Sequence, residues 1–144
     1  MRKLNAMWAA LGTAAIISGT FAVAPSTLAA DSLPDDKQCS KDKDKIKDAE
    51  TQGWCVAIHR RKGNCLACHQ VITKKQWPAK LPPGGNIGPP LVGMKARFPD
   101  KAQLRAQVWD PTKKNPISVM PPFGKHKLLS DKEVDLVVEW LYSL

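Results

Sequence analysis

Two cysteines and a histidine stand close together in the segment Cys65-Leu66-Ala67-Cys68-His69. The pattern Cys-x-x-Cys-His is typical of c-type haem attachment. Two thiols one helical turn apart can add to the two vinyl groups of a porphyrin as thioethers, and the adjoining histidine is then held at one axial face of the iron. The motif occurs once, so the sequence predicts one covalently bound haem c, with Cys65 and Cys68 as attachment points and His69 as an iron ligand.

The same motif has two competing interpretations. A thioredoxin-like redox pair follows a strand of a βαβ unit, but the period-two alternation of a strand is nowhere sustained in this sequence. A structural zinc site needs two further ligands at suitable spacing. The remaining cysteines, Cys39 and Cys55, are distant from the motif and belong to no motif of their own. The pattern therefore favours haem attachment.

A second axial ligand is expected from Met94, Met120, His59 or His126. We expect His59 to face solvent and Met94 to fill the core or a loop. Prolines on both sides of Met120 fix an extended backbone, so a rigid loop presents this side chain. Met120 follows His69 by 51 positions, enough chain to reach the opposite face of a porphyrin. We expect Met120 as the sixth ligand, with His126 as the alternative; His/Met ligation raises the reduction potential and leaves no open position for oxygen or substrate.

The first thirty residues have the positive start, apolar middle and small-residue exit of a secretory signal peptide. We expect cleavage after Ala29 or Ala30; the alternative is an uncleaved anchor, since about twenty apolar residues can span a bilayer. Cys39 lies in too polar a segment to be a lipidation site. The sequence thus predicts a periplasmic protein without a membrane span after cleavage, with residues 31–144 as one cytochrome domain and residues 31–45 as its N-terminal extension.

The composition limits the partners and raises a question about the core. The 144 residues carry a net charge of +9, which is typical of nucleic-acid binding, but export removes nucleic acid from reach. We interpret the basic balance as solubility and as steering toward an acidic protein surface. Five Trp, three Phe and one Tyr are few aromatic residues, so a covalently held porphyrin is expected to supply apolar bulk.

Cys39 and Cys55 are the two cysteines outside the haem motif. In an exported chain two such cysteines most simply form a disulfide, which would fasten the N-terminal segment to the first helix. The alternative is that Cys39 pairs with a partner subunit.

Helical signals predict the elements that position these residues. The clearest helix follows Ser130, because Glu133 completes a capping box and a single apolar face follows at the spacing of a helix, bordered by Trp140 and Tyr142. That face is formed by Val134, Val137, Val138 and Leu141.

Two earlier helices are also expected. One runs from about residue 46 to 60, and Gly53 within it predicts either a close helix crossing or a break. The other follows Asp100, carries Leu104 and Val108, and ends at Asp110-Pro111. The proline- and glycine-rich chain between His69 and Asp100 is expected to be loop. The fold class is therefore all-α, with helices and long loops wrapped around one haem.

The motif, a later Gly-Pro-Pro-Leu segment, a late Met-Pro and a terminal amphipathic helix together resemble class I cytochromes c. The resemblance implies that the first and last helices cross near Gly53 and Trp140, and that a carbonyl near Pro89 or Pro90 accepts the Nδ1 hydrogen of His69. Three blocks, residues 62–69, 85–100 and 119–126, are similar to SoxX, the monohaem subunit of the SoxAX cytochrome complex.

The resemblance to SoxX implies a function. SoxAX joins thiosulfate oxidatively to a cysteine of the SoxYZ carrier protein, and the substrate site of this L-cysteine S-thiosulfotransferase belongs to the SoxA subunit. A SoxX-like chain would form a heterodimer with a SoxA-type cytochrome, accept electrons through its haem and pass them to a downstream cytochrome. The alternatives are a free soluble periplasmic cytochrome c and a haem-based ligand sensor; Met120 argues against the sensor.

Overall fold

The structure is a computed structural model that describes residues 32–144. The predicted signal peptide lies outside the described residues. Within them the chain forms five α-helices and two short 3₁₀ turns, and its only β-pairing is two isolated bridges, which agrees with the predicted all-α class. No helix of this part of the chain is long and apolar enough to cross a membrane. The elements are α1 (Asp36–Lys41), α2 (Ala49–Ile58), η2 (Cys65–Ala67), α3 (Met94–Arg97), α4 (Lys101–Trp109), η3 (Pro111–Lys113) and α5 (Asp131–Tyr142).

The C-terminal helix α5 begins where its capping box predicts. The Ser130 hydroxyl accepts the backbone N–H of Glu133, and the Glu133 carboxylate accepts the N–H of Ser130. The predicted apolar face is buried. Only 1% of Trp140 is exposed, because α2 crosses α5 directly over it, where the resemblance placed the crossing.

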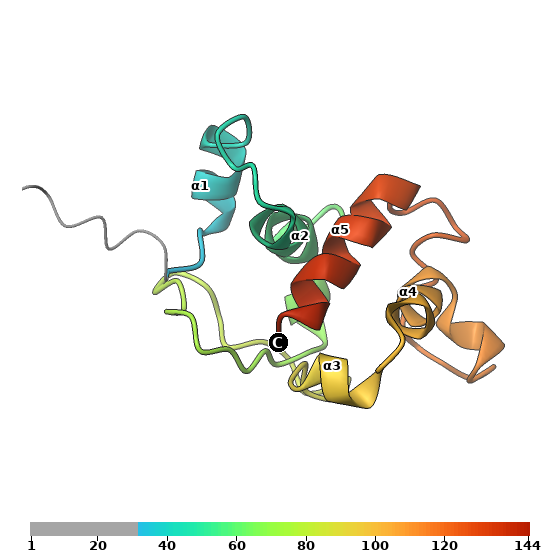
Figure 1. Cartoon of the computed structure of the whole chain (residues 1–144). Coiled ribbons are helices and arrows are strands. Elements are labelled where there is room, and N and C mark those ends of the chain that lie inside the picture. The colour runs from blue at the N-terminus through green and yellow to red at the C-terminus, as the bar shows by residue number, and fades with distance from the viewer. Residues whose placement is uncertain (1–31) are drawn as a thin grey trace, which may run out of the picture.

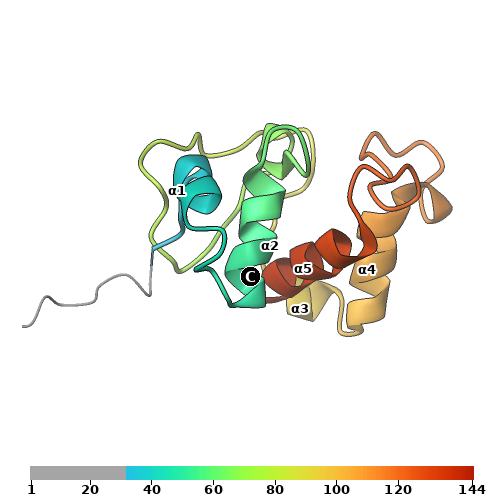
Figure 2. The same ribbon diagram turned by 90° about the horizontal axis from the view of Figure 1, so that it is seen from above.

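Helices α2 and α5 cross at Gly53, as the resemblance implied. A Cβ added at Gly53 would lie 1.9 Å from the carbonyl oxygen of Leu136 and 2.9 Å from Cβ of Trp140. Only a residue without a side chain allows this approach, so the crossing, rather than the alternative of a helix break, explains Gly53. Figure 1 shows α5 lying between α2 on one side and α4 on the other, and Figure 2 shows the same order from above.

Tryptophans fill the centre of the core. The ring centroids of Trp54 and Trp140 are 5.5 Å apart, and Trp77 meets Trp54 edge-on at 5.4 Å. Trp54 is fully buried, and its indole N–H donates to the carbonyl of Pro34 at 2.7 Å. The aromatic bulk of the core is therefore concentrated at the α2–α5 crossing.

The segment 31–45, which the sequence predicted to be an N-terminal extension, contains helix α1. Asp35 caps α1 in a capping box with Gln38, and Cys39 is buried. A disulfide joins Cys39 to Cys55 of α2 with a Cα–Cα distance of 5.5 Å. The two cysteines therefore pair within the chain, and both figures show α1 on the side of α2 opposite α5.

Helix α4 matches the sequence prediction, while α3 was missed. Asp100 caps α4 through the N–H of Ala102. Arg105 Nε donates to Asp135 of α5 at 2.6 Å. The short α3 lies in the segment predicted as loop, and its first residue, Met94, is buried in the core.

Candidate functional site

An apolar cavity lies between the segment that follows α2, the segment that follows η3 and one face of α5. It holds about 330 Å³ of space that no protein atom fills, part of it open to solvent. Three of its lining residues carry possible metal or porphyrin ligands, namely Cys65, His69 and Met120. The other six lining residues are hydrocarbon side chains: Leu91, Val108, Phe123, Leu129, Val137 and Leu141. The fold thus brings two possible axial ligands, far apart in sequence, to one apolar space.

The ring of His69 is fixed by a hydrogen bond. Its Nδ1 lies 2.7 Å from the carbonyl oxygen of Pro89, which confirms the partner that the resemblance to cytochromes c implied. A carbonyl accepts only, so Nδ1 carries the ring hydrogen. Nε2 is then the nitrogen with a free lone pair, as a metal-binding histidine requires.

The backbone at Gly88 lies against the His69 ring. A Cβ at Gly88 would fall 2.3 Å from Cε1 and 2.6 Å from Nδ1, so a side chain there would displace the ring. The N–H of Gly88 also donates to the carbonyl of Cys68 at 2.8 Å. Together with the Pro89 carbonyl, these contacts hold the imidazole in one orientation before any ligand binds.

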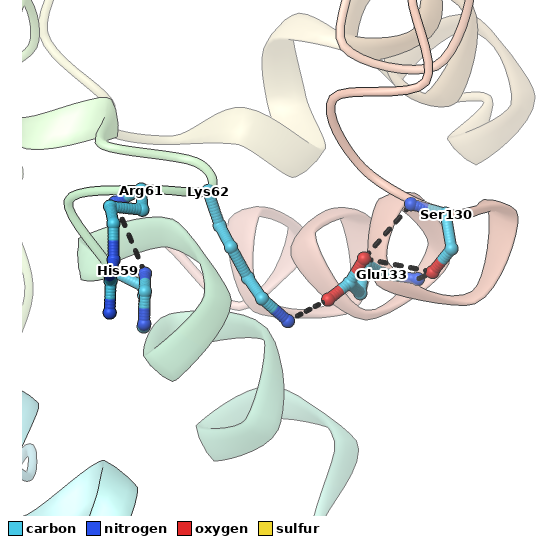
Figure 3. A network of polar contacts seen from close by, with 5 residues as sticks. All are labelled: His59, Arg61, Lys62, Ser130 and Glu133. Atoms are coloured by element: carbon cyan, nitrogen blue, oxygen red, sulfur yellow. Dashed lines mark hydrogen bonds and ion pairs between the residues drawn. The ribbon is translucent and has the colours of Figure 1, made fainter.

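The segment that leads into the motif is tied to the start of α5. Figure 3 shows the Lys62 ammonium donating to Glu133, whose carboxylate also closes the capping box with Ser130. Burial pushes the pKa of Glu133 upward, but the Lys62 ion pair and the Ser130 hydrogen bonds outweigh it and hold that pKa below its ordinary value. In the same loop His59 Nδ1 accepts the N–H of Arg61 at 3.2 Å. The loop before Cys65 therefore has a fixed course.

The two motif cysteines are free of disulfides, unlike the other pair. Burial raises the pKa of the Cys65 thiol to about 12. Redox-active cysteines have lowered pKa values, so this environment argues against the thioredoxin interpretation. The described residues contain no cluster of three or more His, Cys, Asp or Glu side chains placed to hold a metal ion, so the further ligands of a structural zinc site are not found among them.

The other candidate axial ligands lie away from the cavity. Met94 is buried, but its sulfur contacts the Arg97 guanidinium at 3.4 Å and it does not line the cavity. His126 is exposed, and His59 is half-buried at the end of α2, where we had expected it to face solvent. Cys68 is half-buried at the end of η2 and is not among the lining residues.

Sequence reasoning missed three of the nine residues of the cavity wall. Leu91, Phe123 and Leu129 come from irregular segments, where no periodicity marks an apolar side chain as inward-facing. The proline-rich surroundings of these segments were the available signal, because long ordered loops in a small domain usually hold a ligand.

The donor set and its surroundings fit a covalently attached haem. The Cys65 thiol, the His69 imidazole and the Met120 thioether all line one apolar cavity, and Nε2 of His69 has its lone pair available. Gly88 has no side chain that would displace the His69 ring. With the Cys-x-x-Cys-His motif and the α2–α5 crossing, these features define a c-type cytochrome of the class I kind.

Comparison with known sequences agrees with this class. Residues 56–141, more than half of the chain, match the family described as cytochrome C oxidase, cbb3-type, subunit III. The chain belongs to this family of c-type cytochrome domains. Such a domain carries covalently bound haem c and serves in electron transfer.

One curated relative is an "Uncharacterized lipoprotein" of Aquifex aeolicus (strain VF5). It is 33% identical over 83 residues, which cover 58% of this chain and 37% of that protein. The chain thus spans little more than a third of that relative's length.

Proposed function

We propose that this protein transfers electrons through a haem c attached to Cys65 and Cys68 and ligated by His69 and Met120. The observation that carries the proposal is the convergence of Cys65, His69 and Met120 on one apolar cavity. When bound, the haem supplies a one-electron couple. His69 is oriented by Pro89 to present Nε2, and the six hydrocarbon side chains of the cavity keep water away, which together favour a six-coordinate site that exchanges electrons without binding substrate.

The ligation is tested with a matched pair of methionine variants. Met120→Leu should abolish the long-wavelength sulfur-to-iron absorption band of the ferric protein. Met94→Leu removes a buried methionine outside the cavity and should leave the band intact. A band that survives in Met120→Leu would refute Met120 as the sixth ligand. An unmodified protein that lacks the band, together with a ferric spectrum that changes in His126→Gln, would assign the ligation to the alternative residue.

We further propose that the chain is the SoxX-type subunit of a periplasmic SoxAX complex. The support is the similarity of residues 62–69, 85–100 and 119–126 to SoxX. The middle block supplies Leu91 to the cavity and Gly88 and Pro89 to the contacts of His69, and the last block supplies Met120 and Phe123 to the cavity.

The proposed complex would release the electrons that this subunit accepts. On the SoxA-type partner, the outer sulfur of thiosulfate forms a disulfide bond with a cysteine thiol of SoxYZ, and the thiol gives up one proton while two electrons leave. A monohaem subunit accepts these electrons one at a time and passes each to a downstream cytochrome. The enzyme's substrate site is then on the partner, and the basic charge of this chain suits an acidic partner surface.

A second candidate is a free soluble cytochrome c that delivers electrons to an oxidase, and the oxidase named in the family description favours it. Purification of the native, untagged protein separates the two. Co-elution with a second, larger c-type cytochrome, together with haem reduction that depends on thiosulfate and SoxYZ, would support the SoxAX proposal. A monomer that binds no such partner and is not reduced in the mixture would refute it in favour of the free carrier.

A further inference from the structure

Asp110 is the one buried charged residue in the part of the chain that the structure describes, with 3% of it exposed. It lies between the end of α4 and η3. Its Oδ1 accepts the backbone N–H of Thr112 at 3.2 Å and the Thr112 hydroxyl at 2.5 Å, so it caps η3. The Thr112 hydrogen bonds and then Lys125 hold the pKa of Asp110 below its ordinary value, and the carboxylate is charged. The cap of η3 does not require a charged side chain, because asparagine caps helices as well as aspartate does.

The charge of Asp110 faces Lys125. Its Oδ2 lies 3.0 Å from the Lys125 ammonium, and among the described residues this oxygen has no other polar partner. The chain from Pro111 to Leu129 contains four lysines and no acidic residue. The buried carboxylate is therefore the acid that holds this basic segment, and Met120 lies within it.

The backbone reinforces the same attachment. The carbonyl of Trp109 accepts the N–H groups of both Gly124 and Lys125 at 3.2 Å. Gly124 lies flat on the Trp109 ring, where an added Cβ would fall 2.0 Å from a ring carbon. Two consecutive residues at the end of α4 thus hold two consecutive residues of the segment, four and five positions after Met120.

Met120 itself has few polar contacts to hold it. Its N–H donates to the Ser118 hydroxyl at 3.2 Å, a bond within the same segment. The flanking residues Ile117 and Val119 are exposed, so the chain before Met120 is not packed into the core. The position of the sulfur relative to His69 therefore depends on the attachment that follows it, at Phe123, which packs into the cavity wall, and at Lys125.

We propose that Asp110 is a positioning residue for Met120: through Lys125 it holds the Met120 segment against the cavity and keeps the sulfur from leaving the iron. The inference rests on the proposed ligation by Met120. Asp110 is not itself a proposed haem ligand and lies ten positions before Met120 in the sequence. It acts on Met120 through the charge of its Oδ2, which faces Lys125.

The test uses the ferric holoprotein and imidazole as a probe that binds only when Met120 has left the sixth position. Asp110→Asn retains the oxygen that caps η3 and removes the charge. Lys125→Gln removes the exposed partner with little risk to folding, since 53% of its side chain is exposed. The control, Lys101→Gln, removes a lysine of similar exposure, 43%, whose ammonium lies 2.8 Å from the exposed carboxylate of Glu139 at the opposite end of α4.

We expect imidazole to bind Asp110→Asn and Lys125→Gln on the order of tenfold faster than the unmodified protein, as the loss of one charge-assisted hydrogen bond predicts. The double variant should be no faster than the faster single variant, because both remove the same contact. Lys101→Gln should stay within roughly twofold, as an ordinary surface change does.

Unchanged imidazole rates in both variants, with or without a fall in the free energy of unfolding, would overturn the inference and leave Asp110 a purely structural cap. The absence of the sulfur-to-iron band from the unmodified protein would instead refute the proposed ligation, and the inference with it. The two failures are thus distinguished by one spectrum.

Discussion

The crossing of α2 and α5 predicts that Gly53→Ala lowers the free energy of unfolding, although helix propensity alone predicts that this change raises it. In an exposed helix this change stabilises by about 1 kcal/mol. Here the new Cβ would lie 1.9 Å from the Leu136 carbonyl oxygen, whereas real Cβ contacts essentially never fall below 3.0 Å. The helices must therefore separate by at least 1.1 Å, the difference between these two distances. Overpacking of this kind costs about 1–3 kcal/mol, and separation also loosens the contact of Trp54 with Trp140.

We expect Gly53→Ala to lower the free energy of unfolding by up to about 2 kcal/mol, which is the upper overpacking cost less the propensity gain. The measurement is guanidinium unfolding of the holoprotein followed by far-UV circular dichroism, with the midpoint compared at constant slope. Near-UV dichroism should change as well, because the two tryptophan rings shift. A variant as stable as the unmodified protein, with the same near-UV signal, would show that the two backbones do not touch at this position.

Gly93→Ala is the matched control for this prediction. An added Cβ at Gly93 meets nothing within 4 Å, but the backbone there has a φ of +57°, so the substitution costs about 1 kcal/mol of local strain. We expect a smaller loss than in Gly53→Ala and no change in the near-UV signal. A larger loss of stability in Gly93→Ala than in Gly53→Ala would contradict the close approach of the two helices at Gly53.

Three further predictions concern the contacts around the site. Gly88→Ala places a Cβ 2.3 Å from the His69 ring, so the ring should move and the ferric haem spectrum should change. Replacing both cysteines of the disulfide with serine should lower the free energy of unfolding by about 3 kcal/mol, because the bridge closes a loop with a sequence separation of 16. Lys62→Met should cost less than about 1 kcal/mol near pH 7, because the exposed ion pair with Glu133 is screened by water.

The pH dependence of the Lys62 variant follows from the lowered pKa of Glu133. A carboxyl group whose folded-state pKa is depressed contributes stability above its unfolded-state pKa of about 4.5 and loses that contribution as the pH falls through the folded-state value. The stability difference between Lys62→Met and the unmodified protein should therefore disappear in acid. A difference that persists there would show that packing of the lysine stem, not the charge, is responsible.

The other two predictions have their own controls. Gly93→Ala should leave the haem spectrum unchanged, and a Gly88→Ala protein with an unaltered spectrum would contradict the close packing on His69. For the disulfide, reductant should lower the stability of the unmodified protein to that of the double serine variant. A double variant of unchanged stability would show that the bridge adds nothing to the stability of the fold.

Elements with local signals could be predicted from the sequence, and those that depend on long-range contacts could not. Ser130 with Glu133 marked the start of α5, and Asp100 marked the start of α4, because a capping residue acts on the next turn of its own chain. Helix α1 had the same signal in Asp35 and Gln38. It was missed because the alternating lysines and aspartates that follow are more typical of a solvated extension.

The site shows the same division. Cys65, His69 and Met120, which line the cavity, could be singled out from residue type and from the prolines that fix the backbone. The partnership of Asp110 with Lys125 could not be predicted, because a short-range helix stop explained Asp110 well enough and only the folded chain brings the two charges together. The burial of Trp140 was implied only by the resemblance, because no local pattern shows which neighbour crosses α5 at that turn.

The disulfide between Cys39 and Cys55 bears on the order of events during maturation. Four free thiols can form a first disulfide in six ways, and only the bridge between Cys39 and Cys55 leaves both Cys65 and Cys68 open to thioether formation. Thioethers formed first would consume two of the four thiols and leave a single possible disulfide. Haem attachment before oxidation would then prevent incorrect disulfides, since only Cys39 and Cys55 would remain as free thiols.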